Sequence, residues 1–168
     1  MTIETADHIK LVDSHCHLDF DDFAGEIDQV LARAAAQGVG RMVTICTKVT
    51  EFARVLKLAE DHDVLTCSVG IHPHEADKQP EVDVAKLVEL SKHPKVVGIG
   101  EAGLDYFYDK SDRVRQQEVF ATHIEASRRS GLPLIVHSRD ADEDTVRLLQ
   151  EGAGKGGLTG VIHCFTST

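Results

Sequence analysis

Residues 11–20, LVDSHCHLDF, begin with apolar side chains and end in two histidines separated by a single residue. Successive side chains of a β-strand point to opposite faces. His15 and His17 therefore point the same way at a strand end, where two imidazoles side by side can hold one metal ion. Two solvated histidines just past a strand would explain this stretch equally well. The rest of the chain has to decide between the two readings.

The same arrangement, an apolar run followed by a helical pattern, recurs along the 168 residues. Apolar runs predict six strands, at residues 8–15, 41–46, 64–73, 96–104, 132–138 and 161–165. Apolar stripes at helical spacing predict five helices, near residues 27–35, 52–59, 84–88, 112–130 and 145–149. Strand–helix alternation with short loops indicates an α/β fold with a parallel sheet and right-handed crossovers.

The longest helical pattern, over residues 112–130, places Val114, Gln117, Ala121 and Ile124 on one face, with Phe120 and Ser127 beside it, and we expect this face to be buried. Helices often stop on glycine. The glycines that follow helical stripes are therefore expected to mark helix ends; they are Gly38, Gly131 and Gly152.

The number of units indicates an incomplete barrel. An α/β barrel has eight strands and typically about 250 residues. Six strands and five helices correspond to about three-quarters of that. We therefore expect residues 1–168 to form a single domain of the (β/α)8 TIM-barrel type with only about the first six strand–helix units. Open barrel edges invite pairing with another chain, so self-association is expected.

Composition narrows the function classes. The formal net charge of −10 argues against a protein that holds nucleic acid by a broad basic face, but not against an enzyme whose bound cations supply positive charge. The four cysteines form no C-x-x-C pair and lie in or beside apolar runs, which predicts buried free thiols in a reducing compartment. The sequence shows neither a secretory leader nor a membrane-spanning run, so a cytoplasmic location without membrane attachment is expected.

Polar residues gather where the predicted strands end, which is the edge where catalytic groups of parallel α/β folds lie. These strand ends supply His15 and His17, His72 and His74, Glu101 and Asp105, His137 and Arg139, and His163. Imidazole and carboxylate ligands suit Zn, Mn, Fe or Co, and Mg with more water. The ligands are too many for one ion, so we expect two divalent ions bridged by Glu101, with an activated water as nucleophile. The other histidines are expected in solvent or packing positions; they are His8, His62, His93 and His123.

The motifs DSHCHL, GIHPH, VGIGEAGLDYFYD, QQEVFATHIEASRRSGLPLIVHSRDA and GVIHCFT, in that order, resemble the TatD family of metal-dependent deoxyribonucleases, within the wider amidohydrolase-type barrels. The resemblance implies that His15, His17 and Glu101 ligate one ion, and that Glu101, His137 and His163 ligate the other. It also implies that His72 touches a substrate phosphate, and that Asp105 and Arg139 lie near the pocket. Family members have a further ligating aspartate on a later strand, and no residue here matches that position.

The resemblance predicts an exonuclease-like hydrolase that cleaves phosphodiester bonds of single-stranded DNA or DNA ends with two Mg, Mn or Zn ions. Tyr106, Phe107 and Tyr108 either stack on a base or pack their loop. Two alternatives stay open because a fold does not fix a function. One is a hydrolase of small amides, lactones or phosphoesters. The other is an inactive, truncated metal-binding fragment.

Overall fold

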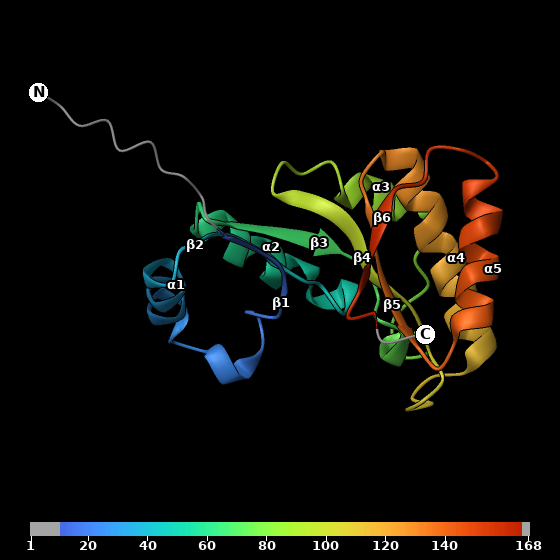
Figure 1. The fold of residues 1–168 in the computed structure, drawn as a ribbon, viewed down its shortest axis with the longest axis horizontal. Helices are drawn as coiled ribbons and strands as arrows, with labels where there is room; N and C mark the ends of the chain where they lie inside the picture. The colour runs from blue at the N-terminus through green and yellow to red at the C-terminus, as the bar shows by residue number, and fades with distance from the viewer. Residues whose placement is uncertain (1–10, 166–168) are drawn as a thin grey trace, which may run out of the picture.

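The computed structural model describes residues 11–165. Six parallel strands form one sheet in sequence order (Figure 1): β1 (Leu11–Cys16), β2 (Val39–Thr44), β3 (Leu65–Val69), β4 (Val96–Asp105), β5 (Leu134–Arg139) and β6 (Gly160–His163). The intervening helices are α1 (Ile27–Ala36), α2 (Phe52–Asp61), α3 (Val84–Leu90), α4 (Arg113–Ser130) and α5 (Asp142–Ala153). This confirms the α/β class and the expected order of six strands and five helices. Residues 8–10 of the first expected strand, together with His8, lie outside the described residues.

The sheet curls so that its two edge strands approach each other at their carboxyl ends. The rings of His15 on β1 and His163 on β6 stack with their centroids 3.4 Å apart, although the two strands are not hydrogen-bonded neighbours. The carboxyl ends of all six strands therefore converge on one region, as in a barrel.

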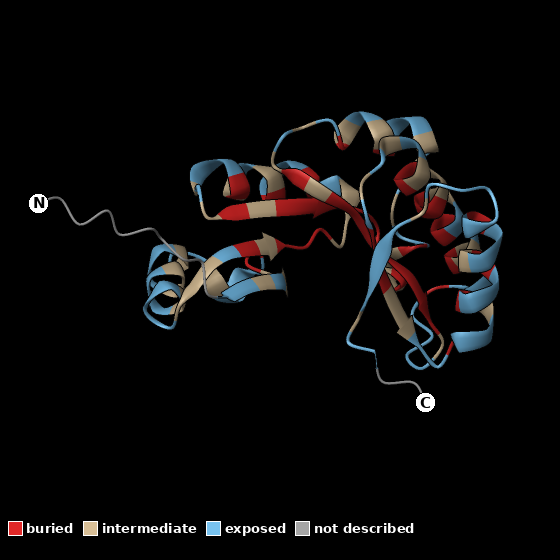
Figure 2. Cartoon of the chain, turned by 45° about the horizontal axis from the view of Figure 1, so that its top comes forward, coloured by how far each residue is buried: buried red, intermediate tan, exposed pale blue. Residues whose placement is uncertain are grey.

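The core lies along β3, β4 and β5, whereas β1 and β6 are largely exposed (Figure 2). Leu65, Ile99 and Leu134 have no more than 1% of their surface exposed, and Phe120 of α4 packs in the same cluster. Such burial contributes roughly 1.5–3 kcal/mol for each large apolar side chain. The best-packed strands are thus the ones that position the centre of the carboxyl edge.

Helix α4 shows where the sequence pattern misleads. Asp112 caps its start by accepting the Arg115 N–H at 3.0 Å, and Gly131 ends it in the left-handed conformation at φ 75°. The expected face is wrong at Val114, which is 63% exposed, and at Ala121, which is also exposed. Ile124 is buried as expected, with Phe120 and Ser127 beside it, and the buried face also includes the polar side chains Gln116 and His123.

Of the other glycines expected at helix ends, Gly38 adopts φ 85° just after α1, as predicted. The expectation for Gly152 is wrong, because this residue lies inside α5. It is buried where a Cβ atom would overlap the Ile124 side chain of α4. Its small size serves close packing between two helices.

All four cysteines are free, as expected. Cys46 and Cys67 are buried, and burial raises the pKa of these thiols to about 11 and about 12. The expectation of burial holds only in part for Cys16, which is half-buried, and fails for Cys164, which is exposed just after the edge strand β6.

Within residues 11–165, no helix combines the length and the apolar character that crossing a membrane requires.

Candidate metal centre

Glu101 occupies the middle of the carboxyl edge. It lies on β4, it is 2% exposed, and its backbone N–H donates to the carbonyl of Cys46 at 3.2 Å. Its carboxylate oxygens face different histidines. Oε2 lies 3.2 Å from Nε2 of His15 and 3.9 Å from Nε2 of His17, whereas Oε1 lies 3.1 Å from Nδ1 of His137 and 3.9 Å from Nε2 of His72. One carboxylate thus offers an oxygen to each of two imidazole groups.

The pairing of β5 with β4 and with β6 aligns His137 and His163 at the carboxyl edge of the sheet. Gly103 and His137 are register partners, and His137 is in turn the partner of His163 on β6. Gly103 has φ 150°, and a Cβ atom there would overlap the carbonyl oxygen of His137. A glycine is therefore required for the two strands to approach this closely.

The donor set fits divalent cations. His15, Glu101 and His163 each offer an atom within 4.8 Å of the others, and so do His72, Glu101 and His137. Nε2 of His15 is buried and lies 3.2 Å from Oε2 of Glu101, where a proton or a metal ion between the two atoms satisfies both. Imidazole nitrogens around one carboxylate match the preferences of Zn and Mn.

His137 is held from its far side by Asp105. Its Nε2 lies 3.1 Å from Oδ2 of Asp105, a fully buried carboxylate, while its Nδ1 faces Glu101. Since the carboxylate accepts the Nε2 hydrogen, a neutral His137 turns the lone pair of Nδ1 toward Oε1 of Glu101. Two acceptors 3.1 Å apart need a cation between them, either a proton or a metal ion. Carboxylates that orient metal-binding imidazoles in this way are common in metal sites.

Asp105 connects several parts of the site. Besides His137 it contacts Nε2 of His74 at 2.7 Å, and its Oδ1 accepts the backbone N–H groups of Phe107 and Tyr108. The fully buried side chain of Gln116 hydrogen-bonds to both backbone groups of Asp105. Sequence reasoning placed His74 at the strand end but gave it no role, and it missed Gln116, for which the pattern carries no signal.

His72 and His137 share the same neutral tautomer but turn opposite ring nitrogens toward Glu101. Its Nδ1 accepts the backbone N–H of His74 at 3.1 Å, so the hydrogen of the neutral ring is on Nε2, which faces Glu101. Burial lowers the pKa of His72 to about 3, which keeps the ring neutral near pH 7. His72 is thus a hydrogen-bond donor at the centre of the site, which suits contact with a phosphate oxygen better than metal ligation.

The charges at the centre favour cation binding. Burial alone would raise the pKa of Glu101, but hydrogen bonds from His137 and His15 outweigh it and hold the pKa below its usual range. Burial likewise opposes ionisation of Asp105, whose pKa is nevertheless lowered by the N–H of Tyr108 and by His74 and His137. Both carboxylates are therefore ionised at neutral pH.

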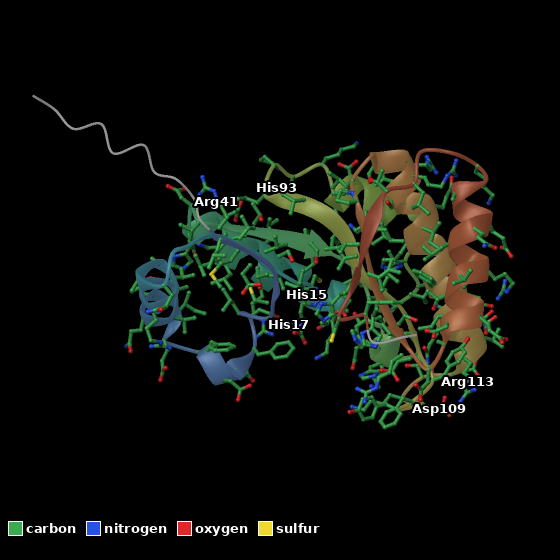
Figure 3. All side chains as sticks on the ribbon, viewed as in Figure 1. His15, His17, Arg41, His93, Asp109 and Arg113 are labelled. Atoms are coloured by element: carbon green, nitrogen blue, oxygen red, sulfur yellow. The ribbon has the colours of Figure 1, made fainter. Side chains whose placement is uncertain are left out.

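Five of the predicted site residues line a cavity of about 460 Å³; they are His17, His72, Glu101, His137 and His163. His15 and His17 lie next to each other at the end of β1 (Figure 3), with ring centroids 5.1 Å apart. The ring of His163 stacks on His15, although its strand neighbour is His137. The division of the ligands between two ions stays a prediction. Arg139 lies at the end of β5 and lines an adjoining cavity.

A family model described as TatD related DNase matches residues 12–168. The sequence is 39% identical over 158 residues to the "Uncharacterized metal-dependent hydrolase YabD" of Bacillus subtilis, which covers 94% of this chain and 62% of that protein. It is 40% identical over 159 residues to the "Uncharacterized metal-dependent hydrolase YcfH" of Escherichia coli K12, which covers 93% of this chain and 59% of that protein.

The fold matches the crystal structure of YJJV, a TatD homolog from Escherichia coli K12. The TM-score is 0.86 at 35% identity, with 95% of this chain and 62% of that chain covered. A hydrolase TatD family protein from Entamoeba histolytica matches with a TM-score of 0.82 at 27% identity, over 94% of this chain and 59% of that chain. These matches confirm the barrel-type fold. The chain spans about three-fifths of the length of these relatives.

Proposed function

Since the chain belongs to the TatD-related DNase family, we propose that it is a metal-dependent hydrolase that cleaves phosphodiester bonds of DNA, at single-stranded regions or ends. The observation that carries the proposal is the Glu101 carboxylate, whose two oxygens face two separate histidine groups. A two-cation centre needs such a bridge. Relatives named as metal-dependent hydrolases support the reaction class.

The residues that would hold two Mg, Mn or Zn ions are His15, His17 and Glu101 for one, and Glu101, His137 and His163 for the other. Bound there, the two ions would lower the pKa of a water and neutralise the charge that develops on the phosphate oxygens. This matches the imidazole-rich, carboxylate-centred donor set.

The chain's own groups would perform the remaining tasks. Asp105 accepts the Nε2 hydrogen of His137 and so keeps its Nδ1 aimed at the centre. The Nε2–H of His72 donates to a phosphate oxygen of the substrate. Lys48, whose ammonium pairs with Glu51 at 3.0 Å, lines the same cavity and adds positive charge near an incoming phosphate. In this proposal Glu101 is the catalytic residue, because it faces both groups of ligands.

Cleavage of end-labelled single-stranded DNA by this chain, with Mn²⁺ or Mg²⁺ and with an EDTA control, tests the proposal. We expect stepwise shortening that EDTA abolishes and that the Glu101→Gln variant, which keeps the size of the side chain, loses. Metal-dependent turnover of a small ester or amide without DNA cleavage would favour the alternative substrate class. If the chain binds metal but cleaves none of these substrates, the result would favour the inactive fragment and contradict the proposal.

A further inference from the structure

The three aromatic residues that follow Asp105, in the loop after β4, differ in how far they are exposed. Tyr106 turns inward, and its hydroxyl lies 2.8 Å from both Oδ2 of Asp144 and Nε2 of Gln117. Phe107 and Tyr108 instead are 54% and 49% exposed. Loop packing thus accounts for Tyr106, while the other two rings keep about half of their surface in solvent.

The exposed rings sit on a fixed backbone. Oδ1 of Asp105 accepts the N–H of Phe107 at 3.1 Å and that of Tyr108 at 2.9 Å. Further along the loop, Asp109 accepts two hydrogen bonds of 2.9 and 3.0 Å from Arg113 at the start of α4, and the two residues lie together (Figure 3). Rings held in place before binding lose little conformational freedom when a ligand stacks on them.

A guanidinium completes the group. The Cζ atom of Arg139 lies 4.2 Å from the ring centroid of Phe107 and 4.8 Å from that of Tyr108, and Nζ of Lys110 lies 5.4 Å from the Tyr108 ring. A guanidinium that contacts rings through its face keeps its in-plane N–H donors for an anion. In a chain of net charge −10, this guanidinium is a local positive charge beside the two rings.

The group adjoins the candidate metal centre. Phe107 and Arg139 line a cavity of about 400 Å³ together with His137 and His163, which also line the central cavity. The Tyr108 ring lies 5.4 Å from the ring of His74, which contacts Asp105. A nucleotide with its phosphate at the metal centre therefore has its neighbouring base within reach of the rings.

We propose that Phe107, Tyr108 and Arg139 form a nucleotide subsite, in which one of the two mutually perpendicular rings stacks on an unpaired base next to the scissile phosphate, the other ring contacts the edge of that base, and Arg139 binds the adjacent phosphate. This inference rests on the proposed function. Stacking on aromatic rings tolerates every base and needs the base to be unpaired. The subsite would therefore select single-stranded DNA or frayed ends without reading their sequence.

Binding of a short single-stranded DNA with 2-aminopurine at its terminal position, measured in EDTA, tests the subsite without turnover. Stacking quenches the fluorescence of this base, so wild type should show saturable quenching. The double variant F107A/Y108A should bind about 5- to 100-fold more weakly and lose the quenching. Y108F, which keeps the ring, should retain both. R139Q should reduce the dependence of log affinity on log salt by about 0.7, as expected for one lost phosphate contact.

The matched control is V114A, which removes an exposed apolar side chain at the start of α4 outside the loop. Far-UV circular dichroism verifies the fold of each variant. If F107A/Y108A binds and quenches like wild type, or if a terminal abasic nucleotide binds as tightly as a normal one, the subsite is overturned while the proposed DNA substrate stands. If wild type binds no single-stranded DNA even with Mn²⁺, the proposed function fails and the subsite fails with it.

Discussion

His123 of α4 should make the stability of the protein depend on pH. It is 1% exposed, its Nε2 accepts the backbone N–H of Ile71 at 3.1 Å, and its Nδ1 lies 2.7 Å from the carbonyl of Val119. This geometry requires the neutral ring, with the hydrogen on Nδ1. Burial lowers the pKa of His123 from 6.5 to about 4. Ile71 precedes His72, so the contact also fixes the end of β3 beside the candidate metal centre.

The direction and the size of this pH dependence of the free energy of unfolding follow from proton linkage. Between pH 6.5 and about 4 the unfolded chain binds a proton at His123, whereas the folded chain does not. The contribution of His123 to stability is therefore present above pH 6.5 and is lost as the pH falls toward 4. A depression from 6.5 to about 4 corresponds to a total loss of about 3 kcal/mol. Between pH 6 and pH 5 the slope approaches about 1.4 kcal/mol per unit.

Urea unfolding of wild type and His123→Gln between pH 8 and pH 5 measures this loss. Glutamine can accept the Ile71 N–H but does not titrate, so the variant should be the less stable protein at pH 8, by about 1–3 kcal/mol. The difference should shrink or reverse by pH 5, while all other titrating groups cancel in the comparison. A difference that stays constant from pH 8 to pH 5 would refute the reasoning.

Three further predictions concern the centre, the packing and the edges. Asp105→Asn should weaken Mn²⁺ binding about 10- to 100-fold by calorimetry, because a neutral amide orients His137 less firmly; unchanged affinity would remove Asp105 from the site. Gly152→Ala should lower the free energy of unfolding by about 1–3 kcal/mol in urea, because its methyl overlaps Ile124; an equally stable variant would contradict the tight helix contact. Val161 is 53% exposed on the edge strand β6 and should promote self-association. In analytical ultracentrifugation the wild-type chain should sediment as a dimer or larger species, and the Val161→Lys variant as a monomer. A monomeric wild type would contradict this prediction.

The sequence was sufficient to predict the order of strands and helices, because apolar runs and stripes carry the period of each element. It also predicted which residues would converge, since parallel strands end at one edge. The apolar pattern did not predict the polar side chains on the buried face of α4. Gln116 and His123 lie on the buried face of α4 because backbone groups of other segments satisfy them, and no periodicity of apolar residues reveals such partners.

Side-chain detail at the candidate site was also beyond the sequence. The motif GIHPH supplied two histidines, but only the hydrogen bonds show that His72 accepts a backbone N–H while His74 contacts Asp105. The three consecutive aromatic residues look alike in sequence. The partners of Tyr106, which lie on α4 and α5, decide that it packs inward while Phe107 and Tyr108 stay exposed.

The central claim is that Glu101 bridges two divalent cations, and calorimetric titration of the metal-free chain with Mn²⁺ tests it most directly. The wild-type chain should bind two ions, and Glu101→Gln should lose at least one of them and bind any remaining ion more weakly. Two ions bound with unchanged affinity by Glu101→Gln would contradict the account, and so would a wild-type chain that binds none.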